Sequence, residues 1–279
     1  MKLIQRLGIT YIQTKFKLLS VVSKKHTAKK AFKVFGTPIF KSVQKGPLKN
    51  ADKVELILNN KKIIGYRWNH PQPKKALILH GFGSAAYKFE EYANIVAEKG
   101  YEILAFDAPA HGNSEGNSTN AIEYCAMIEK VIKKFGPVNS FIAHSFGGIS
   151  LSLALEKLPH DADTKVVFIA PATETTSAVN GAFNMLKIKN EQVRAEFEKI
   201  VVEISGKNTA WFSMRRAMNN ISASVLWIHD KNDDITPWAD AEKVQSDNHS
   251  NIRFIITTGL GHSKIYHDKM VKEQVKKFL

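Results

Sequence analysis

The amino-acid sequence predicts an α/β fold in which a mostly parallel sheet carries helices on both faces. Three observations support this fold class. Short apolar runs alternate with helix-like segments from residue 76 onward, the rhythm of parallel strands joined by helices. Two apolar segments that flank a polar turn precede them. The composition, 44% hydrophobic and 10% aromatic over 279 residues, is that of a globular chain able to bury one large core.

Six short apolar runs have the length expected of buried strands. They lie at residues 76–79, 103–106, 141–143, 166–170, 225–228 and 254–256. Before them, residues 54–58 and 63–68 flank the polar residues 59–62, which predicts an antiparallel hairpin at one edge of the sheet. The sequence therefore predicts eight strands.

Two places carry the signature of a helix start. Asn120, followed by Glu123, resembles a capping box, in which each side chain satisfies a backbone N–H of the first turn. Thr236 precedes Pro237, as an N-cap precedes a proline at the first helical position. Helices are expected to begin at both points.

The spacing of the strands breaks once. Residues 173–222 separate two strands by about fifty residues, where strands elsewhere lie about thirty apart. Within this segment, residues 193–204 and 211–218 have a helical pattern. We therefore expect a helical lid after the sixth strand, with Trp211 and Phe212 in an apolar substrate-binding wall.

Positive charge is concentrated at the start of the chain. Residues 1–50 carry eleven Lys and one Arg with no Asp or Glu, whereas the rest has 28 basic and 26 acidic residues. This contrast predicts a basic N-terminal arm, residues 1–51, ahead of a globular domain, residues 52–279. The arm is expected to contact an anionic membrane surface. Its apolar anchors would be Leu3, Ile4, Leu7, Phe16, Leu19, Phe32 and Phe35.

Other partner classes find little support in the sequence. No nucleic-acid recognition module accompanies the lysines, so no nucleic acid is expected to bind. The histidines and acids lack metal-binding spacings, and we expect neither a metal nor a cofactor. Lys15 and Lys17 interrupt the N-terminal apolar residues before a signal-peptide core forms. The expected location is cytoplasmic, with peripheral contact to a membrane through the arm.

The strongest chemical signal surrounds Ser145. The apolar run 141–143 leads into His144-Ser145-Phe146-Gly147-Gly148 and then into a helix-like segment. So tight a strand-to-helix turn needs small residues two positions either side of the serine, and Ala143 and Gly147 meet that need. Ser145 by itself would also suit an ordinary helix N-cap. His144 is included among the predicted substrate-binding residues, although the turn should direct its side chain away from the serine.

Two further loops suit acyl-transfer chemistry. His80-Gly81-Phe82-Gly83-Ser84 follows the first core strand, and the backbone N–H groups of Phe82 and Phe146 would face a developing oxyanion. Gly81 and Gly83 would let the backbone approach the substrate. His262 follows Gly259-Leu260-Gly261 after the last strand, where it would act as a base.

A carboxylate that orients the base is expected after the seventh strand. Asp230, Asp233 and Asp234 all lie there. Such a carboxylate holds the imidazole in one tautomer and stabilises its positive charge during proton transfer. On position alone, the three acids compete for this role.

The chain resembles the α/β-hydrolase superfamily of serine hydrolases, which includes lipases, esterases and serine aminopeptidases. The resemblance covers residues 52–279 and is carried by HGFGS at 80–84, FDAPAHGNS at 106–114, AHSFGG at 143–148, WIHDKNDDITP at 227–237 and GLGH at 259–262. It implies an α/β-hydrolase fold with Ser145 as nucleophile and His262 as general base. It selects Asp233, four residues before Pro237, as the acid.

Two alanines depart from the motifs of this superfamily. Ala143 replaces the first glycine of G-x-S-x-G. Ala110 replaces the first glycine of the D-x-x-G-x-G-x-S loop, which makes the geometry of that loop a point to examine.

The expected reaction is hydrolysis of a small-molecule carboxylic ester, or a close acyl derivative, through an acyl-enzyme. One alternative is an NAD(P)-dependent oxidoreductase, because residues 81–86 match G-x-G-x-x-G/A and Asp107 ends the next strand. A second alternative is a non-catalytic membrane-surface or scaffold protein with this fold.

Overall fold

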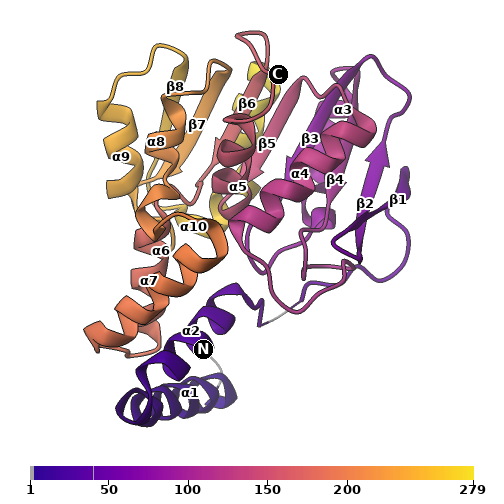
Figure 1. Ribbon diagram of the computed structural model, residues 1–279. Coiled ribbons are helices and arrows are strands. Elements are labelled where there is room, and N and C mark those ends of the chain that lie inside the picture. Colours follow the sequence, from indigo (N-terminus) through magenta and orange to yellow (C-terminus); the bar gives the residue numbers. More distant parts are fainter. Residues whose placement is uncertain (1–2, 40) are drawn as a thin grey trace. The chain divides into compact units, whose positions relative to one another are not determined.

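The computed structural model describes residues 3–39 and 41–279, and within them it forms one eight-stranded sheet (Figure 1). The strand order is β1-β2-β4-β3-β5-β6-β7-β8. The strands are β1 Ala51–Leu58, β2 Lys61–Trp68, β3 Lys74–Leu79, β4 Tyr101–Phe106, β5 Ser140–His144, β6 Lys165–Ile169, β7 Ser224–Asp230 and β8 Ile252–Thr257. Each overlaps one of the eight predicted runs, so the prediction of the sheet is confirmed.

The pairing is parallel from β4 through β8, and within the described residues only β2 runs antiparallel to the other strands. Strand β1 pairs antiparallel with β2, and β2 pairs antiparallel with β4. The hairpin turn places Asn59 and Asn60 at φ 48° and 60°, the left-handed values of a two-residue type I′ turn, which asparagine tolerates well. The predicted edge hairpin is therefore confirmed.

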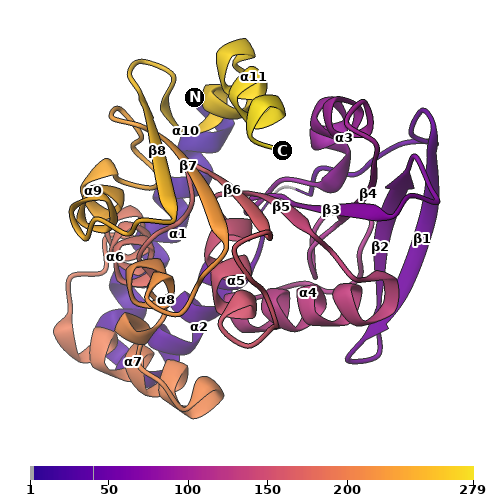
Figure 2. The same cartoon turned by 90° about the horizontal axis from the view of Figure 1, so that it is seen from above.

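Helices cover both faces of the sheet (Figure 2). On one face lie α3 Glu90–Ala97 and α11 Lys269–Phe278, whose Tyr92, Val96 and Val271 are buried in one cluster with Ile78 of β3. On the other lie α4 Ala121–Phe135, α5 Phe146–Leu155 and α8 Met214–Met218. Helix α5 is buried along nearly its whole length. This is expected of a helix that follows a central strand and has other helices beside it.

Four further elements lie in the unit that holds the sheet. They are η1 Ala86–Phe89, α9 Trp238–Ser246, α10 Gly261–Lys264 and η3 Ile265–His267.

The two predicted helix starts have different outcomes. Asn120 caps α4, because its side chain accepts a hydrogen bond from the Glu123 N–H at 2.9 Å. The prediction at Thr236 is wrong, because α9 begins at Trp238 with Pro237 in the cap position. No side chain of the described residues caps α9, and the Thr236 hydroxyl donates to Asp233 at 2.8 Å.

The helix predicted over residues 211–218 is also wrong as a single element. A 3₁₀ turn, η2 Thr209–Trp211, ends before Phe212, and α8 begins only at Met214. Ser213 separates them with extended backbone, and its hydroxyl caps α8 by accepting from the Arg216 N–H at 3.2 Å. By contrast, α7 Glu191–Ser205 confirms the helix predicted over 193–204.

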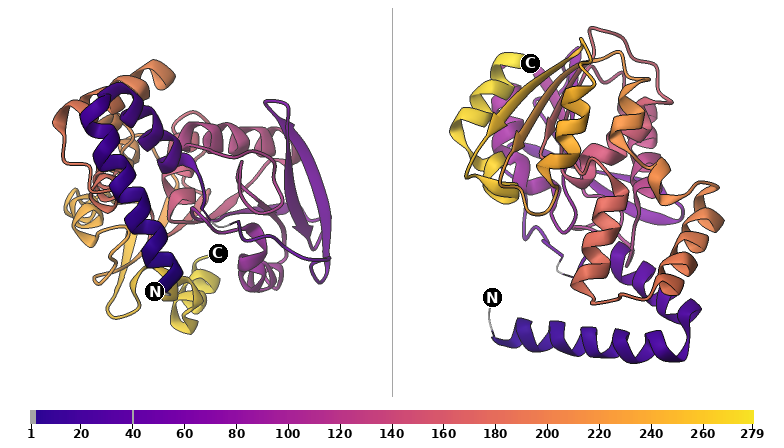
Figure 3. Two further views of the ribbon diagram at one scale, coloured as in Figure 1. Left: turned by 90° about the horizontal axis from the view of Figure 1, so that it is seen from below. Right: turned by 90° about the vertical axis from the view of Figure 1, so that its left-hand side faces the viewer.

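The chain divides into two compact units, residues 38–173 with 213–279, which hold the sheet, and residues 1–37 with 174–212. The second unit, hereafter the helical unit, contains α1 Leu3–Val22, α2 Lys24–Gly36, α6 Thr175–Met185, α7 and η2, and Figure 3 shows α1 and α2 as consecutive helices. The basic N-terminal segment is thus helical over residues 3–22 and 24–36.

The helical unit has an apolar core of its own. Phe16 of α1 is buried in one cluster with Val179, Phe183 and Phe197 of α6 and α7. The ring of Phe197 meets Phe183 edge-on at a centroid distance of 5.3 Å, a preferred geometry for aromatic pairs. The first 37 residues therefore fold with a segment more than 130 residues away in the sequence.

Candidate active site

The backbone at Ser145 is held in an unusual conformation between β5 and α5. Its φ of 52° and ψ of −118° lie in a region that non-glycine residues adopt only when their surroundings enforce it. The Ser145 N–H donates to the Ile169 carbonyl at 3.2 Å, and its own carbonyl accepts from Gly148 and Ala172 at 2.9 and 3.0 Å. Ser145 thereby projects its hydroxyl from the top of a buried strand.

A small residue is required two positions after the serine. A Cβ added to Gly147 would lie 2.7 Å from the carbonyl oxygen of Leu79 at the end of β3. The turn therefore leaves no room for a side chain at position 147, as the sequence pattern indicated.

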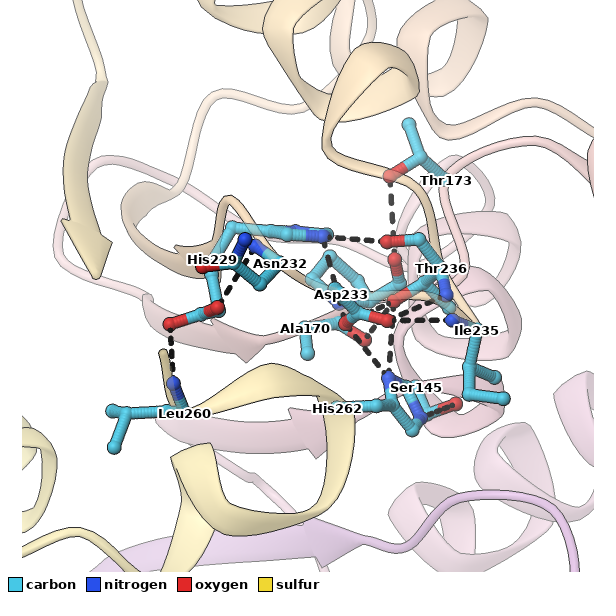
Figure 4. A network of polar contacts seen from close by, with 12 residues as sticks. Ser145, Ala170, Thr173, His229, Asn232, Asp233, Ile235, Thr236, Leu260 and His262 are labelled. Atoms are coloured by element: carbon cyan, nitrogen blue, oxygen red, sulfur yellow. Dashed lines mark hydrogen bonds and ion pairs between the residues drawn. The ribbon is translucent and has the colours of Figure 1, made fainter. Parts of the chain in front are cut away.

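Ser145, His262 and Asp233 form one hydrogen-bonded row (Figure 4). The Ser145 Oγ lies 3.0 Å from His262 Nε2, and His262 Nδ1 lies 2.8 Å from Asp233 Oδ2. A carboxylate oxygen can only accept, so Nδ1 carries the proton and Nε2 is left to accept from the serine hydroxyl. The three residues come from the ends of β5, β7 and β8, which parallel pairing brings to one edge of the sheet.

Asp233 is fully buried and fully hydrogen-bonded. Its Oδ1 accepts from the backbone N–H groups of Ile235 and Thr236 at 2.9 and 2.8 Å. Burial by itself would raise the pKa of this carboxyl, but the hydrogen bond and charge of His262 and the donors of Thr236 bring the pKa below its usual value. Asp233 is therefore ionised at neutral pH and supplies a fixed negative charge next to the imidazole.

Two neighbours of this row were not found by the sequence reasoning. Thr236 Oγ1 donates to Asp233 Oδ2 and lies 3.1 Å from His262 Nδ1. His229 is buried and its Nε2 donates to the Thr236 carbonyl at 2.8 Å, which fixes the loop that carries the acid. Thr236 and Pro237 were interpreted as the start of a helix. The sequence contains no pattern that indicates a role for His229.

The three candidate acids have three different environments. Asp230 is fully buried, and its Oδ2 accepts from the Leu260 N–H at 3.0 Å and the Thr257 hydroxyl at 2.7 Å. It therefore holds the loop that precedes His262 rather than the imidazole itself. Asn232 assists, because its Oδ1 accepts from the Gly259 N–H at 2.9 Å. Asp234 is exposed.

Phe82 and Phe146, whose backbone N–H groups are the predicted oxyanion donors, have side chains in contact. The rings of Phe82 and Phe146 meet edge-on at a centroid distance of 5.6 Å. Phe146 is the first residue of α5, where backbone N–H groups have no partner within the helix. A Cβ on Gly81 would lie 2.9 Å from the Ser145 Cβ, so the backbone of this loop passes directly over the serine, and Gly83 has the left-handed φ of 71°.

His144 is buried and does not present its ring to a substrate surface. Its ring packs against those of Tyr266 and His262, at 4.6 and 4.9 Å, and Nε2 donates to the His262 carbonyl at 3.3 Å. Burial lowers the pKa of His144 to about 3, so the ring is neutral. These contacts place His144 against His262, and the substrate-binding role predicted for it stays a prediction.

The loop after β4 keeps its turn although an alanine replaces a glycine. Ala110 adopts a left-handed φ of 67° and its N–H donates to the Glu115 carbonyl at 2.9 Å. Asp107 accepts from the N–H groups of Ala86 and Asn113, both at 2.8 Å, and burial raises its pKa to about 6. A carboxylate so enclosed is not available to a ribose hydroxyl, which removes the main support for the dinucleotide alternative.

Trp211 and Phe212 lie in the helical unit. Their rings pack edge-on, with centroids 5.1 Å apart. Their role as an apolar wall for substrate, and the lid role of residues 173–222, stay predictions.

Comparison with known proteins identifies the family. Residues 76–240 match the alpha/beta hydrolase family. A Mycoplasma pneumoniae protein named "Putative esterase/lipase 2" is 26% identical over 115 residues, which are 40% of this chain and 42% of that protein. The uncharacterized hydrolase YugF of Bacillus subtilis is 33% identical over 95 residues, 32% of this chain and 34% of that protein. Each alignment thus spans less than half of the relative.

Solved structures share the fold over a greater length. The esterase Pf2001 of Pyrococcus furiosus superposes with a TM-score of 0.66 at 20% sequence identity, over 86% of this chain and 96% of that one. The matched residues 76–240 run from β3 into α9 and include Ser145 and Asp233. On this evidence, the chain belongs to the alpha/beta hydrolase family.

Proposed function

We propose that the protein is a serine hydrolase that cleaves a small-molecule carboxylic ester, or a close acyl derivative, through an acyl-enzyme on Ser145. The observation that carries the proposal is the unbroken row of hydrogen bonds from Ser145 through His262 to a buried, ionised Asp233. Esters are favoured because an esterase/lipase and an esterase are among the proteins that this chain is similar to.

The proposed reaction begins with attack on the substrate carbonyl carbon. His262 Nε2 takes the proton of the Ser145 hydroxyl as Oγ bonds to that carbon. The resulting imidazolium then gives this proton to the leaving oxygen, and the alcohol departs from the acyl-enzyme. A water molecule then attacks the acyl carbon as His262 takes its proton, and the imidazolium returns this proton to Ser145 Oγ as the bond from Oγ to the acyl carbon breaks and the carboxylic acid departs.

Asp233 is proposed to fix the tautomer of the His262 ring. As an acceptor at Nδ1, it keeps the proton on that nitrogen and leaves Nε2 free to accept from the serine. Its charge also stabilises the imidazolium that forms during each proton transfer, in a site where burial reduces screening by water.

The N–H groups of Phe82 and Phe146 are proposed to stabilise the oxyanion of the tetrahedral intermediates. Donors that are fixed before reaction need no reorganisation as charge develops, and loss of one such donor typically lowers the rate about a hundredfold or more. The close approach of Gly81 to Ser145 supports this assignment, because Phe82 is the next residue along the same loop and a substrate carbonyl attacked by Ser145 would lie beside that loop.

The non-catalytic alternative is disfavoured by the strain at Ser145. A φ of 52° at a serine destabilises the fold by about 1–3 kcal/mol, and such conformations concentrate at functional sites. An N-cap serine would adopt ordinary extended backbone instead.

Covalent labelling tests the nucleophile. A fluorophosphonate should label the wild-type protein once, on the peptide that contains Ser145, because only a serine activated by a base attacks the phosphorus centre. Ser145→Ala and His262→Ala should abolish labelling and ester hydrolysis, as followed by peptide mass spectrometry and release of nitrophenol.

The matched control for that experiment is His267→Ala, because His267 is exposed and lies five residues beyond His262. It should label like the wild type. Absence of labelling in folded wild-type protein, or labelling at another serine, would overturn the assignment.

Asp233→Asn should lower kcat by about 10³–10⁴-fold with little change in the melting temperature. The asparagine amide would donate toward His262 Nδ1, so the imidazole proton would move to Nε2 and block acceptance from the serine. Asp234→Asn, the same substitution at the exposed neighbour, should leave kcat within about twofold. Steady-state kinetics distinguish the two, and equal losses in both variants would contradict the assigned role.

Asp230 should act as a positioning residue for His262. Asp230→Asn would place an amide N–H against the Leu260 N–H, and we expect kcat to fall about tenfold to a hundredfold with little change in KM. Hydrogen exchange of residues 259–262 should accelerate. Asp240→Asn, which changes a buried acid of α9 paired with Lys243, is the control. Unchanged kcat in a folded Asp230 variant would contradict this role.

A further inference from the structure

Helix α1 exposes large apolar side chains on the side opposite its core contacts. The exposed fractions are 67% for Tyr11, 65% for Leu18, 76% for Val21 and 82% for Val22. On the opposite side, Phe16 is buried in the core of the helical unit. A surface helix usually turns polar residues outward, so apolar residues on both sides of α1 call for a second contact.

The exposed apolar residues form one stripe with lysines at its edges. Residues 11, 18 and 22 repeat at the seven- and four-residue spacings that share one side of a helix, and Val21 lies three residues after Leu18. Helical spacing at 100° per residue places Lys15 along one edge of this stripe and Lys17 along the other. Both lysines are exposed.

The charge of the helical unit comes from its first two helices. Residues 1–37 contain nine basic residues and no acidic residue, whereas residues 174–212 contain five of each. Two of the acids of α7 are paired within that helix, Glu198 with Arg194 at 3.3 Å and Glu196 with Lys199 at 2.6 Å. The positive charge of α1 and α2 is therefore left to attract an external anionic partner.

We propose that the outer face of α1, defined by Tyr11, Lys15, Lys17, Leu18, Val21 and Val22, docks on an anionic lipid membrane. The apolar side chains would enter the boundary between headgroups and acyl chains, as they do for interfacial helices. The lysines at the edges would extend their ammonium groups to the lipid phosphates and carboxylates. This proposal does not depend on the chemistry at Ser145.

The helix is suited to lie on a membrane, not to cross it. Among the helices of the described residues, none is both long and apolar enough to span a bilayer. The phosphates of a nucleic acid would attract the lysines, but a leucine and two valines would add little to its binding. The apolar side chains therefore favour a lipid partner.

The contacts change which side chains serve as anchors. Phe16 is buried, and Phe32 and Phe35 pack on Phe197 at centroid distances of 5.6 and 6.2 Å, so they stabilise the helical unit and are not free to enter a membrane. Leu19 is partly buried. The side chains of Leu3, Ile4 and Leu7 lie outside the described part of the chain.

Co-sedimentation of the full chain with vesicles tests the proposal. Vesicles of phosphatidylcholine mixed with phosphatidylserine should bind the wild type, and binding should weaken as salt rises. Leu18→Gln with Val22→Gln should weaken binding at least tenfold. Lys15→Gln with Lys17→Gln should weaken it about fivefold per lysine. Bound vesicles should also slow hydrogen exchange in residues 11–22.

Matched controls come from the same unit. Ile204→Gln changes an exposed apolar residue of α7, and Lys187→Gln with Lys189→Gln removes two exposed lysines with the same spacing as Lys15 and Lys17. All control variants should bind like the wild type.

Three results would overturn the proposal. Equal binding to pure phosphatidylcholine and to the mixed vesicles would exclude an anionic surface. Full binding by the Leu18 and Val22 variant would exclude the apolar stripe. Failure to bind vesicles, with binding of duplex DNA that needs Lys15 and Lys17 but not Leu18, would assign the face to nucleic acid instead.

Discussion

The left-handed backbone at Ser145 is the constraint on which the site depends. A strand that ends in this conformation must turn at once into a helix, so its neighbours have to lie very close. Gly147 therefore abuts the end of β3, and Gly81 passes over the serine at a distance that a Cβ would not allow. Three backbone hydrogen bonds, to residues 148, 169 and 172, hold the turn. The same close packing supports the proposal that the N–H groups of Phe82 and Phe146 stabilise an oxyanion.

Two buried aspartates, Asp230 at the end of β7 and Asp233 in the loop after it, have different contacts. Both carboxyls have lowered pKa values, because hydrogen bonds to the ionised form outweigh the cost of burial. Asp233 contacts the imidazole, whereas Asp230 contacts the backbone that leads to it. Thr236 and His229 join the loop to the acid. The position of His262 therefore depends on both the loop that follows β7 and the loop that follows β8.

Features that depend on local patterns were predictable from the sequence. The eight strands follow from apolar runs, and Asn120 caps α4 because its partner lies only three residues away. Thr236 shows the limit of such reasoning, because its hydroxyl donates a hydrogen bond to Asp233 and does not cap the helix that follows. The association of α1 and α2 with α6 and α7 could not be predicted, because no local signal records which distant apolar side chains Phe16 and Phe197 will meet.

Acyl transfer to Ser145 can be tested by trapping the adduct on the protein. An aryl carbamate donates its acyl group to an activated serine, and the adduct hydrolyses slowly, so it accumulates. Intact and peptide mass spectrometry should show one carbamoyl group per chain, on the peptide that contains Ser145, with release of one phenol. If the protein hydrolyses esters but carries the adduct on another residue, or carries none, the result would contradict acyl transfer to Ser145.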